Sequence, residues 1–124
     1  MARTDVDVAR PVQRVMVGTD RSETAERAVS WAAAFAERYG AELHVVQVIL
    51  PQHPGDTAYG AAEATRARGA ADALETYVRE LAGDRGRSHV VIDDDPAMAI
   101  VHATEDQGID VLVVGNAGSS SITT

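Results

Sequence analysis

Four short runs of apolar residues divide the chain, and between them apolar residues recur every three or four positions. An unbroken apolar run is typical of a strand covered on both faces, whereas the three- and four-residue spacing is typical of a helix with one apolar face. The predicted strands are residues 12–17, 43–50, 89–92 and 109–114. The predicted helices have their apolar faces within residues 25–39, 61–82 and 96–107.

Turn and capping residues stand where these elements should begin and end. Gly40 predicts a left-handed end to the first helix, and Asp95 followed by Pro96 predicts the start of the third. Either Asp20 or Ser22 could cap the first helix. The alternation of strands and helices predicts an α/β fold: an open, doubly wound parallel sheet in a Rossmann-like three-layer α/β/α arrangement.

The pattern weakens at both ends of the chain. Residues 1–11 are polar and acidic and are predicted to be a mobile N-terminal arm. Residues 12–118 carry the periodic elements and form one predicted domain, and residues 119–124 are predicted to be a flexible tail. Four strands are therefore visible, and the fifth strand of such a sheet is missing.

Composition narrows the classes of function. The chain has 124 residues, a formal net charge of −8 and a pI of about 4.8, which disfavours binding to nucleic-acid phosphates. All basic residues except histidine are Arg, so a P-loop, which requires Lys, is excluded. There is no Cys and no apolar stretch long enough for a membrane span, and we expect a cytoplasmic protein without membrane partners.

Two glycine-bearing segments follow predicted strands and form the candidate site. Gly18, Thr19 and Asp20 end the first strand, and Gly115 to Gly118 follow the fourth. In a parallel sheet the carboxyl ends of the strands lie at one edge, and ligands bind there at the topological switch point. The two segments therefore predict one small-molecule site, provided that their strands are neighbours.

No comparable pattern predicts a metal site or an enzyme. Asp93, Asp94 and Asp95 fit a capped helix start with solvated carboxylates better than a metal site. The four histidines lack metal-ligand spacing, and most of them are expected at the surface or at strand edges: His44, His53, His89 and His102. No set of nucleophile, base and orienting residue is evident, so we do not expect an efficient enzyme.

Three segments together resemble the universal stress protein family: residues 17–25 (VGTDRSETA), 40–46 (GAELHVV) and 110–118 (DVLVVGNAG). The similarity extends from about residue 12 to residue 118 in the family's order and spacing. It implies a stress-response or regulatory protein that binds ATP or another adenine nucleotide, with or without Mg²⁺, hydrolyses ATP slowly at most, and forms a homodimer.

The resemblance also implies roles for individual residues. Asp20 matches the aspartate that contacts the ribose hydroxyls, and Gly18 and Thr19 line the same turn. Val48 matches the residue that contacts adenine. The phosphate side is matched by Gly115, Asn116 and Gly118, and Arg21 stands where many members have Gly, from where its guanidinium could reach a phosphate.

The chain departs from the family after Gly118. ATP-binding members carry the pattern G-x2-G-x9-G-[S/T], and only its first half stands here, at residues 115–118. The family's last helix and strand are also missing. The expectation is an incomplete domain or, failing that, a fourth strand whose outer edge is covered by another subunit.

Two other functions stay open: cyclic AMP binding, or action through dimerisation or partner docking without a nucleotide.

Overall fold

The computed structural model describes residues 11–52, 57–116 and 119–123. The predicted N-terminal arm thus lies outside the described residues, apart from Pro11. The strands are β2 (Arg14–Thr19), β3 (Glu42–Ile49), β4 (Gly86–Ile92), β5 (Val111–Asn116) and β6 (Ser119–Thr123). The helices are α1 (Glu23–Tyr39), α2 (Gly60–Ala82) and α3 (Pro96–Asp106), with short 3-10 turns at Thr57–Tyr59 and Gly83–Arg85.

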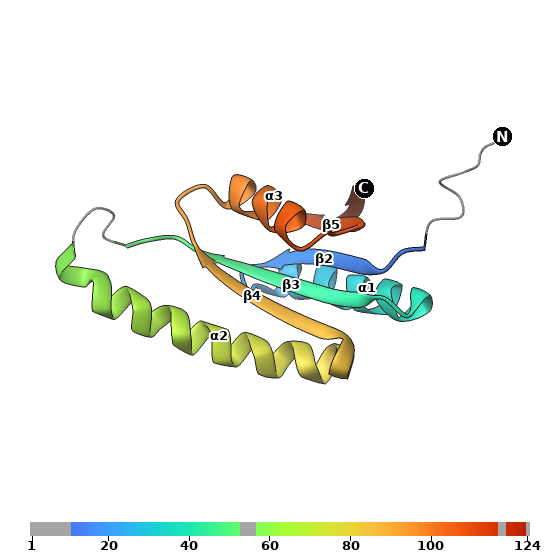
Figure 1. The fold of residues 1–124 in the computed structure, drawn as a ribbon, viewed down its shortest axis with the longest axis horizontal. Coiled ribbons are helices and arrows are strands. Elements are labelled where there is room, and N and C mark those ends of the chain that lie inside the picture. The colour runs from blue at the N-terminus through green and yellow to red at the C-terminus, as the bar shows by residue number, and fades with distance from the viewer. Residues whose placement is uncertain (1–10, 53–56, 117–118, 124) are drawn as a thin grey trace.

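The strands form one sheet in the order β4-β3-β2-β5-β6. The first four of these are parallel to one another, and β6 is antiparallel to β5. Helices α1 and α2 lie on one face of the sheet and α3 lies on the other (Figure 1). The predicted α/β architecture with four parallel strands is therefore confirmed.

The fifth strand was not predicted, and the expectation of a flexible tail at residues 119–124 is wrong for residues 119–123. These residues form β6, which pairs with β5 from Leu112↔Thr123 to Asn116↔Ser119. A parallel neighbour would require a long crossover, whereas an antiparallel neighbour needs only a short connection, here residues 117–118. The outer edge of β5 is thus covered by its own chain rather than by another subunit.

The main core lies between the sheet and the helices α1 and α2. Alternate residues of the strands point to this face, and residues at three- and four-residue intervals on the helices meet them. The largest fully buried members of this core are Leu43, Leu74, Val15, Val17, Val29, Val45, Val78 and Val113. Met16 of β2, Val46 of β3 and Ala99 of α3 are also buried and do not belong to this core.

The helix boundaries follow the capping chemistry. Ser22 is the N-cap of α1, with its Oγ accepting a hydrogen bond from the Ala25 N–H (3.2 Å), so of the two candidates Ser22 is the cap. Gly40 ends α1 with φ of 63°, and Asp95 caps α3 with Pro96 in the first turn, as predicted. Within the described residues, no helix is both long and apolar enough to cross a membrane.

Candidate functional site

A cavity of about 590 Å³ opens at the carboxyl ends of the central strands. It lies at the topological switch point of the sheet, because the strand order proceeds from β2 to β3 on one side and to β5 on the other. Its wall combines the turn between β2 and α1, the ends of β3 and β5, and the first turns of α3. The lining residues are Gly18, Thr19, Asp20, Ser22, Thr24, Ala25, Val46, Val48, Leu50, Pro96, Ile100, Leu112, Val113, Val114 and Gly115.

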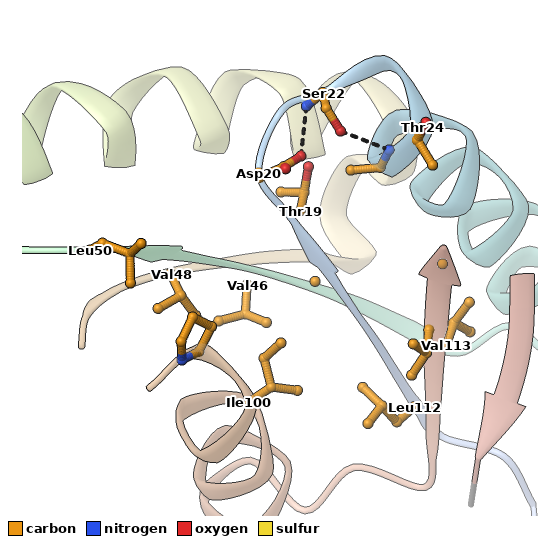
Figure 2. Close-up of a pocket in the computed structure, with 15 residues that line it drawn as sticks. Thr19, Asp20, Ser22, Thr24, Val46, Val48, Leu50, Ile100, Leu112 and Val113 are labelled. Carbon is orange, nitrogen blue, oxygen red and sulfur yellow. Dashed lines mark hydrogen bonds between the residues drawn. The ribbon is translucent and has the colours of Figure 1, made fainter. Parts of the chain in front are cut away.

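The turn after β2 presents the carboxylate of Asp20 at the mouth of this cavity. Its Oδ1 accepts a hydrogen bond from the backbone N–H of Ser22 (2.9 Å), drawn as a dashed line in Figure 2. Hydrogen bonding from Ser22, through its side chain and then its backbone, lowers the pKa of Asp20 from its usual value. Asp20 is therefore ionised at neutral pH and offers an exposed acceptor to a ligand hydroxyl.

The interior of the cavity is apolar. Val46 and Val48 of β3 face Ile100 of α3, and Leu112 of β5 lies on the same side (Figure 2). Gly18 allows this approach, because a Cβ at that position would lie 3.1 Å from Ile100 Cδ1. A flat apolar ring would bury its faces against such a wall, while a polar group attached to it could reach Asp20.

Five of the predicted site residues lie together in this cavity: Gly18, Thr19, Asp20, Val48 and Gly115. The predicted phosphate loop is different. Gly115 and Asn116 belong to β5 and pair with Ser120 and Ser119, so they are extended strand rather than a turn of clustered amides. Gly118 lies outside the described residues.

Arg21 does not line the cavity. Its φ is 67°, a left-handed conformation that explains why a glycine is suited to this position. Its Nε donates to Glu26 Oε2 at 3.1 Å, and its guanidinium carbon lies 4.3 Å from the centre of the Tyr77 ring. The described geometry thus directs the guanidinium toward α1 and α2, away from the position expected for a phosphate contact.

A second polar cluster, which the sequence did not predict, lies at the opposite end of the sheet's strands. His44 is only 3% exposed, and its Nδ1 is 2.9 Å from His89 Nε2, while its Nε2 is 2.9 Å from Glu42 Oε1. Glu42 also forms ion pairs with Arg14 and Arg87. No group of three or more candidate ligands within the described chain is arranged to hold a metal ion. The two contacts of His44 make this cluster a hydrogen-bonded chain from Glu42 to His89.

The protonation states follow from the acceptor at one end of that chain. The hydrogen bond from His44 lowers the pKa of Glu42, with the positive charges of Arg87 and Arg14 contributing. An ionised carboxylate only accepts, so His44 carries its proton on Nε2 and, when neutral, accepts through Nδ1 from His89 Nε2–H. Burial, and then the proximity of His44, lower the pKa of His89.

We expect the protein to lose stability on mild acidification through this cluster. Because the folded-state pKa of His89 lies below its unfolded value of about 6.5, protonation favours the unfolded state. The stability that His89 contributes is fully present above pH 6.5. It is lost as the pH falls through the lower pKa that His89 has in the folded state. Urea unfolding at several pH values between 5 and 8 should show His89→Gln with a flatter profile than the parent.

The matched control is His102→Gln, which changes an exposed histidine on α3 for which no comparable contact is described. It should keep the parent's pH profile. A profile for His89→Gln as steep as that of the control would contradict the assignment of this acid sensitivity to His89.

Comparison with known proteins agrees with the fold. The model of the universal stress protein family matches residues 11–124. Universal stress protein Rv1636 of Mycobacterium tuberculosis is 35% identical over 115 residues, covering 87% of this chain and 78% of that protein. Among solved structures, the universal stress protein of Archaeoglobus fulgidus in complex with dAMP has a TM-score of 0.61 at 22% identity, covering 82% of this chain and 79% of that one. A universal stress protein in complex with cAMP has a TM-score of 0.60 at 22% identity, with coverages of 81% and 73%. The chain belongs to the universal stress protein family.

Proposed function

We propose that this chain binds an adenine nucleotide, ATP or another, in the cavity at the ends of β2, β3 and β5, and acts in stress response or regulation rather than through efficient catalysis. The observation that carries the proposal is the placement of one ionised carboxylate, Asp20, at the mouth of an apolar cavity. Asp20 would accept hydrogen bonds from the ribose hydroxyls, and Val48 would pack against the base. Two structurally similar universal stress proteins have been solved in complex with cAMP and with dAMP.

Ligand-induced stabilisation tests this function. A ligand at 100 times its Kd should raise the free energy of unfolding by about 2.7 kcal/mol, which a thermal-shift titration with ATP, AMP and cyclic AMP would detect, with and without Mg²⁺. Asp20→Asn should weaken binding by about tenfold or more, because it removes a charged acceptor.

The control is Asp72→Asn, which removes the same charge from an exposed residue of α2 that does not line the cavity. It should bind as the parent does. A lack of stabilisation by all three nucleotides, in a protein shown to be folded, would rule out the proposed function.

A second candidate is action through partner docking without a nucleotide. It is favoured by one observation: β5 continues through Asn116 and pairs with β6, where ATP-binding relatives of this chain are expected to have a phosphate loop. Mass spectrometry of small molecules released from freshly purified protein separates the two functions. In the docking case no nucleotide should co-purify, and Asp20→Ala should leave partner binding unchanged.

The expected homodimer and cytoplasmic location belong to the same proposal. Sedimentation velocity at several protein concentrations tests the dimer directly. A single species with the mass of one chain at all concentrations would exclude it.

A further inference from the structure

The described wall of the cavity carries no positive charge. Of the residues that line it, Asp20 is the only ionisable one, and it is negative at neutral pH. Sites for nucleoside polyphosphates ordinarily place Lys, Arg or a cluster of backbone amides on the phosphates. The base and ribose positions are thus present here without a cationic side chain beside them.

The sequence supplies no such side chain from the β5 side either. The chain contains no Lys, and residues 109–124 contain no Arg or His. From residue 111 onward the printed sequence therefore offers no cationic side chain to a ligand group beside the end of β5. A polyphosphate directed toward β5 would gain no counter-ion from this segment.

The two arginines described close to the cavity rim are both paired with carboxylates. Arg21 is held by Glu26 and by the face of Tyr77. Arg66 Nη2 donates to the Leu50 carbonyl at 3.0 Å and lies 3.2 Å from Glu63 Oε2. Each guanidinium is therefore neutralised by a partner of its own before any ligand arrives.

The helix N-termini near the cavity are offset by acidic side chains as well. The partial positive charge at the start of α1 is countered by Glu23 and Glu26 in its first turn. At the start of α3, the lining residue Pro96 directly follows three aspartates at positions 93–95. The electrostatic surroundings of the cavity are therefore negative on both sides.

We propose that this cavity selects adenine ligands for low negative charge, so that the uncharged nucleoside adenosine binds more tightly than AMP, and AMP more tightly than ATP. The inference rests on the proposed function, because it concerns the same cavity. Each added phosphate brings negative charge toward Asp20 and the acidic helix starts without gaining a cationic partner.

Isothermal titration of the full chain with adenosine, AMP and ATP tests the order of affinities. We expect adenosine to bind at least about tenfold more tightly than ATP at low ionic strength, with the gap narrowing in 0.5 M salt as the repulsion is screened. ATP that binds as tightly as adenosine, with or without Mg²⁺, would overturn this inference and leave the proposed function standing. Absence of binding by all three compounds would instead overturn the proposed function and the inference with it.

A pair of variants tests whether pairing of Arg21 withholds its charge from the ligand. Glu26→Gln breaks the ion pair of Arg21, whereas Glu23→Gln removes the same charge from the same helix turn and touches no described contact of Arg21. We expect Glu26→Gln to tighten ATP binding about threefold more than Glu23→Gln does, and neither variant to change adenosine binding. Equal effects of the two variants on ATP would overturn the role assigned to Arg21.

Discussion

Replacing Gly86 with Ala is expected to lower the free energy of unfolding by about 2–3 kcal/mol, because overpacking at this position cannot relax easily. A Cβ at Gly86 would lie 2.7 Å from Val78 Cγ1 and 2.9 Å from the Val78 carbonyl oxygen. The carbonyl belongs to the backbone of α2, and Val78 is buried in the core. Figure 1 shows α2 running alongside β4 up to the turn that joins them, so the helix could move away only by uncovering the sheet.

The control for this prediction lies within the same helix. Gly69 is in the interior of α2, and a Cβ there would meet nothing within 4 Å. Gly69→Ala should therefore raise the free energy of unfolding by about 1 kcal/mol through helix propensity alone. Urea unfolding curves measure both changes, and a Gly86→Ala protein as stable as the parent would show that α2 and β4 do not need their close approach.

His44→Ala is expected to cost about 3 kcal/mol of stability. The substitution empties a buried position in β3 and leaves His89 Nε2 without its described partner, so cavity formation and an unsatisfied polar group act together. His89→Ala should cost less, because His89 is only partly buried. Denaturant unfolding of both variants and of the double variant gives the coupling between the two rings, expected at about 1 kcal/mol or more.

His102→Ala serves as the control for this series. This histidine is exposed on α3, and the change should stay within about 0.5 kcal/mol of the parent. A loss for His44→Ala no larger than that of the control would contradict the structural role of the cluster.

Local patterning was sufficient to predict the four parallel strands and three helices, because each is marked by its own spacing and end signals. Gly40 ends α1 where expected, and the Asp95–Pro96 pair begins α3 where expected. The strand β6 was missed because the Ser-rich segment at residues 119–123 carries no apolar alternation, and its pairing with β5 depends on a neighbour already in place.

The candidate site was predictable where it depends on topology and not where it depends on side-chain direction. Asp20 and Val48 line the same cavity because β2 and β3 are parallel and end at one edge of the sheet. The contact between His44 and His89 depends on register, which places His89 opposite Val46, two residues along β3 from His44. No spacing along the chain encodes that register, just as none shows where Arg21 directs its guanidinium.

The face of the sheet that carries the cavity is only partly covered by helices, and this affects how fast a ligand would associate and dissociate. On the α3 face, α3 is the one helix described, and Val114 at the β5 flank of the cavity is 43% exposed. Within the residues that the structure describes, nothing closes over this flank, and a molecule bounded by them alone would enter and leave without waiting for a lid to open. We expect short residence times for a bound ligand. The occupancy of the cavity would then re-equilibrate quickly whenever the ligand concentration changes, and the protein would not retain a ligand after its concentration falls.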